Sequence, residues 1–323
     1  MDPLSDVLRA VRLSGGVFLD ARFTAPWSIS SRLMAEDTRA FMTAPAQIIA
    51  YHVVIKGRLL IAVEGAPAIE VAAGEIVMIP RNEAHRLASA PGLPPVDGRQ
   101  LVAPSAEGGL AQIRHGGGGE GTDIVCGFLA SEDAYNPLIA TLPRLLRLDI
   151  RAATSRDWIE ASVRFAAREL TEGRLASSSV MSRLSELLFV EAVRHYAATL
   201  TDSEAGWLTG LKDPQVGRAL ALIHQNIGAA WTAESLAREV ALSRSAFMDR
   251  FTSLVGVPPI RYLTTWRLQT ARLNLRESSK SIRQLAHAVG YASEEAFSRA
   301  FKREFGVSPA RWRDGNAEGS ESG

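Results

Sequence analysis

The stretch SRSAFMDRFTSLVGVPPIRY, residues 243–262, returns as SEEAFSRAFKREFGVSPARW at residues 293–312. Aligned without gaps, the two copies share Ser, Ala, Phe, Phe, Gly, Val, Pro and Arg at equivalent places. A matching piece precedes each copy, SLAREVALS at 235–243 and QLAHAVGYAS at 284–293. Self-similarity at a fixed spacing is the signature of a repeated structural unit. The last hundred residues therefore contain one motif twice.

Each copy has the pattern of two helices separated by a short turn. Ser243 and Ser293 stand where the second helix of each copy begins, and a serine hydroxyl there accepts a hydrogen bond from a free backbone amide. We place the first motif at about residues 232–254 and the second at about 281–305. The segment PIRYLTTWRLQTARLNL between the copies can form one long helix. Two helix-turn-helix units on a rigid connection suit a chain that reads two successive major grooves, about 34 Å apart, without dimerising.

The charge of the chain is divided unevenly along its length. The whole chain has 36 Lys and Arg against 35 Asp and Glu, a net charge of +1. Residues 213–314 contain 15 of the basic residues and 9 of the acidic ones, so this segment carries +6 and the remainder −5. A basic segment favours a polyanionic partner such as nucleic acid.

The repeats also carry a family resemblance. The pieces WTAESLAREVALSRSAFMDRFTSLVGVPPIRYL, WRLQTARLNL and SIRQLAHAVGYASEEAFSRAFKREFGVSPARWR resemble the DNA-binding domain of the AraC/XylS family of bacterial transcription regulators. The resemblance covers about residues 213–313 and implies an all-α domain over 213–314. It implies sequence-specific binding of double-stranded promoter DNA and, as is usual in the family, activation of transcription with RNA polymerase as a partner. Residues 201–212 are then a linker, and residues 315–323 a polar, disordered tail.

The family's DNA-facing positions are carried over one by one. Arg299 is favoured as a base contact, whereas Glu294 and Glu295 either contact bases or stabilise the helix dipole. Arg267 and Arg272, on the connecting helix, either touch phosphate or are solvated. The DNA-binding residues that the resemblance implies are Arg244, Ser245, Met248 and Asp249 in the first motif, and Glu294, Glu295, Ala296, Arg299, Lys302 and Arg303 in the second.

The N-terminal part has a different pattern. Between residues 45 and 90, short runs rich in Ile and Val are separated by Gly or Pro, which indicates the strands of a sandwich or barrel. Residues 91–122 are rich in Gly and Pro and are expected to form a loop. From about Asn136 the pattern becomes helical, with helices predicted at Arg156–Glu172 and Ser177–Leu200. The apolar stripe of the second helix is wide enough to cover the barrel and also to contact a second subunit.

One segment of this region resembles a known barrel motif. GEIVMIPRNEAH, residues 74–85, is similar to the second motif of the cupin barrels, with Gly74, Pro80 and His85 in register and Asn82 in place of a glycine. The metal ligands of the first cupin motif are missing, although His52 lies on a suitable strand face. His52 and His85 are therefore expected to be structural or to bind a small-molecule effector, with no metal and no cofactor. Cys126 is expected to be a small buried apolar residue.

Together these patterns predict a multidomain α+β protein. A cupin-like β-barrel with appended helices occupies residues 1–200, where it senses a small molecule or forms a homodimer, and an all-α double helix-turn-helix domain follows it. The single cysteine excludes an internal disulfide. No membrane-length apolar run or signal peptide is visible, which favours the cytoplasm. No catalytic residues are assigned, so a transcription regulator is favoured over a cupin metal-dependent oxidoreductase or a protein-interaction adaptor.

Overall fold

The computed structural model describes residues 4, 7, 13–38, 45–104, 110–131, 137–149, 178–200 and 206–317. The chain divides into two compact units, one formed by residues 11–200 and the other by residues 201–323 together with residues 1–10.

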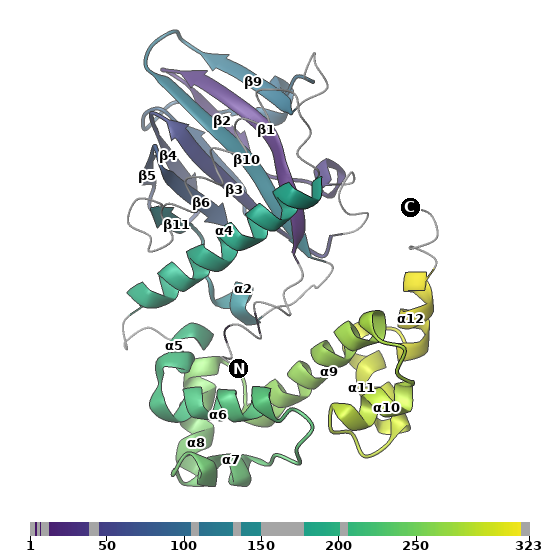
Figure 1. The fold of residues 1–323 in the computed structure, drawn as a ribbon. Helices are drawn as coiled ribbons and strands as arrows, with labels where there is room; N and C mark the ends of the chain where they lie inside the picture. The colour runs from purple at the N-terminus through teal and green to yellow at the C-terminus, as the bar shows by residue number, and fades with distance from the viewer. Residues whose placement is uncertain are drawn as a thin grey trace. The chain divides into compact units, whose positions relative to one another are not determined.

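The N-terminal unit is built on two β-sheets (Figure 1). The six-stranded sheet has the order β11-β6-β3-β10-β1-β9, and the five-stranded sheet has the order β5-β4-β7-β2-β8. No described strand belongs to both sheets, so the predicted barrel takes the form of a cupin-like sandwich. The strands are β1 (Ser14–Thr24), β2 (Ser28–Ser31), β3 (Gln47–Lys56), β4 (Arg58–Val63), β5 (Ile69–Ala72), β6 (Glu75–Ile79), β7 (His85–Ala88), β8 (Val96–Asp97), β9 (Ala111–Gly116), β10 (Gly121–Ser131) and β11 (Leu146–Asp149).

Alternating apolar side chains form the core between the sheets. In β4 the buried residues Leu59, Ile61 and Val63 alternate with more exposed ones, as expected for a strand with one face inward. Phe23 and Trp27 stack in the same core with ring centroids 4.1 Å apart. Burial of such alternating faces is the main force that holds the two sheets together.

The cupin-like segment forms β6, a turn and β7. Asn82, at the position of the motif's glycine, has a positive φ of 48°, a conformation that asparagine tolerates better than most residues. Its side chain binds both backbone groups of Leu33, accepting from the amide at 3.2 Å and donating to the carbonyl at 2.7 Å. The substitution of glycine by asparagine therefore preserves the turn and ties it to a neighbouring segment.

Two sequence predictions for this unit are wrong. Within the described residues 137–149, the predicted helical pattern gives a short helix, α2 (Pro137–Thr141), followed by strand β11, which pairs antiparallel with β6. The alternation of buried Leu146 and Leu148 with exposed Arg147 explains the strand, and Arg147 donates to buried Glu75 at 2.6 Å. The expected loop at 91–122 also contains β8, β9 and a 3-10 helix (Gly98–Leu101).

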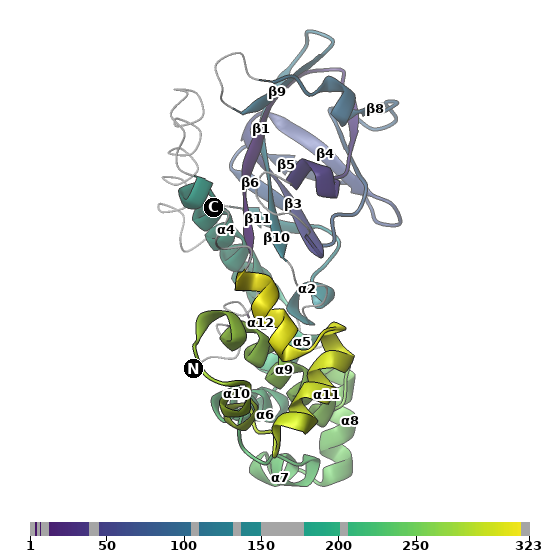
Figure 2. The ribbon, with the colours of Figure 1, turned by 90° about the vertical axis from the view of Figure 1, so that its right-hand side faces the viewer.

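Helix α4 (Ser178–Thr199) covers the outer face of the six-stranded sheet, where it contacts β1, β10 and β11 (Figures 1 and 2). The hydroxyls of Tyr51 on β3 and Ser185 on α4 are 2.7 Å apart and buried. Gly127 makes this contact feasible, because a Cβ there would lie 2.1 Å from the Tyr51 ring. Leu187 on the same helix is 45% exposed. The other predicted helix, Arg156–Glu172, lies outside the described residues.

The described part of the C-terminal unit is all-helical. Its helices are α5 (Trp207–Lys212), α6 (Pro214–Gln225), α7 (Ala233–Glu239), α8 (Arg244–Val255), α9 (Pro259–Glu277), α10 (Ile282–Ala288), α11 (Glu294–Phe305) and α12 (Pro309–Ala317). Helix α9 joins one group of helices, α5 to α8, to a second group, α10 to α12 (Figure 1). Among the described helices of the chain, none is long and apolar enough to cross a membrane.

Both ends of this unit differ from the sequence prediction. Half of the expected linker 201–212 is helix α5, whose Trp207 is fully buried and donates from Nε1 to the Tyr262 hydroxyl at 3.0 Å. The expected tail 315–323 begins too early, because α12 continues to Ala317. In both places the segment is a helix packed against other helices of the unit, α5 against α6 and α8, and α12 against α9 and α11. Local composition does not contain this information.

Candidate nucleic-acid interface

The two helix-turn-helix motifs have the same caps. In the first motif the Ser243 hydroxyl accepts a hydrogen bond from the Ala246 amide at 3.2 Å, and in the second the Ser293 hydroxyl accepts from the Ala296 amide at 3.2 Å. Helices α8 and α11 each span 12 residues and each end at a glycine with positive φ. The repeated sequence therefore builds two second helices of equal length.

The turns inside the two motifs close in the same way but differ in length. The Leu242 amide donates to the Ala237 carbonyl at 3.0 Å, and the Tyr291 amide donates to the Ala286 carbonyl at 2.9 Å. The residue before each donor is left-handed, Ala241 with φ 56° and Gly290 with φ 84°. This is the Schellman pattern of a helix end. One extra residue then precedes the cap of the second motif.

Aromatic pairs hold each second helix by its inner face. Phe247 and Phe251 in α8 lie with ring centroids 5.6 Å apart, and Phe297 and Phe301 in α11 repeat this distance. All four side chains are fully buried. With one face fixed in a core, the opposite face of each helix is free to meet a groove of DNA.

The predicted DNA-binding residues lie on α8 and α11, and none of them is buried. Met248, Glu294 and Ala296 are partly buried, and the other seven are exposed. The exposed Glu295 has a pKa below its ordinary value, because the carboxylate accepts from its own backbone amide and from the Ser293 hydroxyl. Arg283 and Arg299 lower this pKa further. Of the two roles considered for Glu295, these contacts favour stabilisation of the helix N-terminus.

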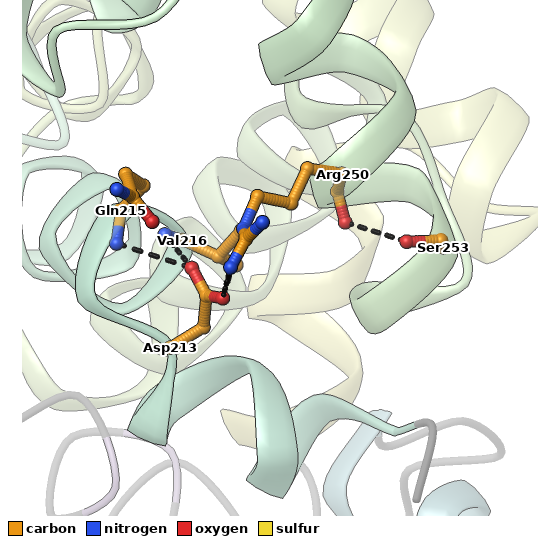
Figure 3. Close-up of polar contacts among 5 residues, drawn as sticks. All are labelled: Asp213, Gln215, Val216, Arg250 and Ser253. Carbon is orange, nitrogen blue, oxygen red and sulfur yellow. Dashed lines mark hydrogen bonds and ion pairs between the residues drawn. The ribbon is translucent and has the colours of Figure 1, made fainter. Parts of the chain in front are cut away.

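An ion pair ties α8, the second helix of the first motif, to the start of α6 (Figure 3). The Asp213 carboxylate accepts from Arg250 Nε at 2.9 Å and from Arg250 Nη2 at 2.5 Å. Its other oxygen caps α6 by accepting from the amides of Gln215 at 3.1 Å and Val216 at 2.9 Å. Burial alone would raise the pKa of Asp213, but these hydrogen bonds outweigh it and hold the pKa below its usual range. This ion pair is not predicted from the sequence, although an aspartate before a proline at a helix start is a recognisable cap signal.

The two arginines of the connecting helix have partners inside the protein. The half-buried guanidinium of Arg267 donates to the backbone carbonyl of Ile227 at 2.9 Å and to that of Ala229 at 2.6 Å. Arg272 is 5% exposed and lies over the rings of Phe305 and Trp312, 5.0 and 5.5 Å from their centroids. Both arginines therefore have internal partners that neither sequence-based alternative included, and buried Arg272 is not solvated.

The N-terminal unit contains a buried chain of hydrogen bonds. His85 Nδ1 lies 2.9 Å from the Glu83 carbonyl, His52 Nε2 lies 2.8 Å from His85 Nε2, and His52 Nδ1 lies 3.0 Å from Cys126 Sγ. A carbonyl only accepts, so His85 Nδ1 carries hydrogen, His52 Nε2 donates to His85, and the Cys126 thiol donates to His52. Every group in this assignment is neutral.

Burial of these hydrogen-bonded groups favours the neutral forms of His52, His85 and Cys126. Burial lowers the pKa of His52 and of His85, and the neighbouring His85 lowers that of His52 further. Burial also raises the pKa of the Cys126 thiol. The structure brings His52 and His85 together, and it gives Cys126 a polar partner that the sequence did not predict. Within the described ranges, no group of three or more His, Cys, Asp or Glu side chains is arranged to hold a metal ion.

Comparison with known proteins agrees with this architecture. The Cupin family profile matches residues 2–198, and the Helix-turn-helix domain profile matches residues 236–315. A putative AraC-like transcription regulator of Streptomyces lividans is 31% identical over 319 residues, covering 97% of this chain and 98% of that protein. The HTH-type transcriptional regulator AlkR of Acinetobacter baylyi is 29% identical over 97% of this chain and 99% of its own.

Among solved structures, the DNA-binding domain of AdpA in complex with a target DNA is 31% identical, and the match covers 34% of this chain and 99% of that chain with a TM-score of 0.33. The chain is a transcription regulator in which a cupin domain precedes a helix-turn-helix DNA-binding domain. It belongs to the family of AraC-like transcription regulators.

Proposed function

We propose that α8 and α11 enter two successive major grooves of one promoter site and that Arg299 is the principal base-reading residue. The observation that supports this most directly is the pair of capped, equal-length helices, each held by buried phenylalanines with its other face exposed. Arg299 is exposed on α11, and an arginine fork suits the acceptors of guanine. Lys302 and Arg303, further along α11, bind phosphate.

The test compares two basic residues of the same helix. Arg299→Ala weakens binding to the preferred site by about 1–3 kcal/mol and relaxes the sequence preference at one position. Lys302→Ala, the matched control, weakens binding to all sequences alike and lowers the salt slope by about one. Selection of bound sequences from random duplex DNA, run with the wild type and both variants, measures each effect. An unchanged sequence preference for Arg299→Ala would contradict the assignment.

We propose that the cupin unit is a sensor for a small-molecule effector and not an enzyme. The buried chain of His52, His85 and Cys126 supports this, since these groups bind one another in an otherwise apolar core. An effector with a polar group exchanges the bond between the two histidines for bonds of its own. His52→Leu then removes stabilisation by an effector in a thermal-shift screen, whereas the wild type is stabilised. Stoichiometric iron or manganese in the purified protein would favour the oxidoreductase instead.

The remaining partners follow from this role. We propose that the protein forms a homodimer through the outer face of α4, where Leu187 is exposed, and that it activates transcription by RNA polymerase in the cytoplasm. Leu187→Glu separates dimer formation from DNA binding in one experiment. It lowers the molecular mass in solution to that of a monomer and leaves binding to a single promoter site intact. An unchanged dimer would remove α4 from the interface.

A further inference from the structure

The side chain of Arg267 connects parts of the C-terminal unit that are far apart in sequence. Arg267 lies in the middle of α9, and both of its bonded carbonyls, those of Ile227 and Ala229, belong to the segment between α6 and α7. That segment leads directly into the first helix-turn-helix motif. The guanidinium therefore ties the connecting helix to the first motif at a point well away from the chain junction between α8 and α9.

The same guanidinium also lies against the turn of the second motif. A Cβ on Gly290 would lie 2.5 Å from Arg267 Nη2 and 2.8 Å from the Gly228 carbonyl. A Cβ on Gly228 would in turn lie 2.9 Å from the Ala288 carbonyl. Two glycines therefore let the segment before the first motif, the turn of the second motif and the Arg267 guanidinium meet in one place.

We propose that Arg267 is a positioning residue that fixes the distance and the rotation between α8 and α11, and thereby the spacing of the two DNA blocks that the protein accepts. The proposal rests on the proposed reading of two grooves. A single connecting helix leaves each motif free to pivot at its junction, whereas a second attachment in the middle of α9 removes that freedom. The required accuracy is high, because one base pair changes the rotation by about 34° and the distance by about 3.4 Å.

The main test compares spacing preferences of the full-length chain. Random duplex DNA is selected with the wild type and with Arg267→Met, which keeps the unbranched apolar stem of the side chain but not its donors. We expect the wild type to enrich two blocks at one spacing, and the variant to enrich the same blocks at several spacings. On the wild-type site, insertion of one base pair lowers wild-type affinity by about tenfold, the cost of one mismatched base pair, and variant affinity by less than about threefold.

The salt dependence of binding separates this role from a phosphate contact. If Arg267 bonds only groups inside the protein, the slope of log affinity against log salt concentration is unchanged in Arg267→Met. Loss of a phosphate contact instead lowers that slope by about 0.9 and weakens binding at every spacing equally. A single, unchanged spacing in the variant, or a lower salt slope, would overturn the proposal.

The glycines provide a matched pair of variants. Gly290→Ala places a methyl group against the guanidinium, whereas Gly306→Ala has a similar positive φ, 78° against 84°, and nothing within 4 Å. Both variants carry the strain of a left-handed alanine, and they differ in that only Gly290→Ala disturbs the contacts of the Arg267 guanidinium. Gly290→Ala should broaden the accepted spacing and Gly306→Ala should not. Equal spacing profiles for the two variants would contradict the role of the contact.

A distance measurement tests the proposal without relying on DNA. Ser253→Cys on α8 and Glu304→Cys on α11 provide two exposed labelling positions, and the native Cys126 is buried. Pulsed electron resonance of the doubly labelled full chain should give a narrow distance distribution, and the addition of Arg267→Met should broaden it. A distribution of unchanged width would show that α9 alone sets the geometry.

Discussion

Asp213 gives the most direct test of how the start of α6 is held and joined to α8. Replacing Asp213 with alanine removes two contacts at once, the cap on α6 and the ion pair with Arg250. Replacing it with asparagine keeps an oxygen that can accept from the amides of Gln215 and Val216 but removes the negative charge. Arg250→Met removes only the other half of the ion pair. The three variants separate the cap from the charge.

The magnitudes can be worked from the contacts. Loss of an N-cap aspartate costs about 1 kcal/mol of free energy of unfolding. The ion pair contributes less than the cap, because the Arg250 side chain is 50% exposed and solvent screens it. Asp213→Ala should therefore cost somewhat more than about 1 kcal/mol, whereas Asp213→Asn and Arg250→Met should each cost clearly less than that.

Hydrogen exchange of the full chain is the suitable assay, because it reports local opening in a protein of two units. Asp213→Ala should speed exchange at the start of α6, while Asp213→Asn should change it little. The lowered pKa of Asp213 adds a pH dependence. Its contribution is present above the unfolded pKa, about 3.9, and is lost as the pH falls through the folded pKa. Equal exchange in the alanine and asparagine variants would show that charge rather than the cap holds α6.

Three further predictions concern other parts of the fold. Ala241→Gly should raise the melting temperature of the C-terminal unit, since relief of the left-handed alanine exceeds the added chain entropy by about 0.5–1 kcal/mol; a lower melting temperature would show that the turn is not strained. Lowering the pH from 7 to 5 should destabilise the N-terminal unit, because the histidines bind protons in the unfolded chain, whereas burial lowers the pKa of His52 and His85 and keeps them neutral in the folded one. His52→Leu should make the stability of this unit less dependent on pH. Gly127→Ala should cost about 3 kcal/mol by driving a methyl into the Tyr51 ring, whereas Gly121→Ala, with open space around it, should unfold like the wild type.

The sequence predicts what local pattern and repetition control. The caps at Ser243 and Ser293 and the buried phenylalanines all follow from the repeat, because each feature is set within a few residues. The second cupin motif likewise indicates the turn at Asn82. Helix α4 also follows from the sequence, since its apolar stripe is wide.

The contacts that the sequence does not predict join distant segments. Arg267 binds carbonyls about forty residues earlier, and Asp213 binds Arg250 across a helix pair. A basic residue on a helix of a DNA-binding domain suggests phosphate by composition alone, and only the fold shows that its donors are used internally. Strand β11 was missed for a similar reason, because its four residues become a strand by pairing with β6.

The buried series of hydrogen bonds from Glu83 to Cys126 also couples the two sheets. His85 begins β7 of the five-stranded sheet, whereas His52 and Cys126 lie on β3 and β10 of the six-stranded sheet. The hydrogen bond between the two histidines therefore links two sheets that share no described strand. Its donors all point the same way, so a ligand that reverses one of them must reverse or break the next. A change of hydrogen bonding in one sheet therefore alters the bonds of the other sheet. Tyr51, the neighbour of His52, bonds Ser185 and so connects this change to helix α4.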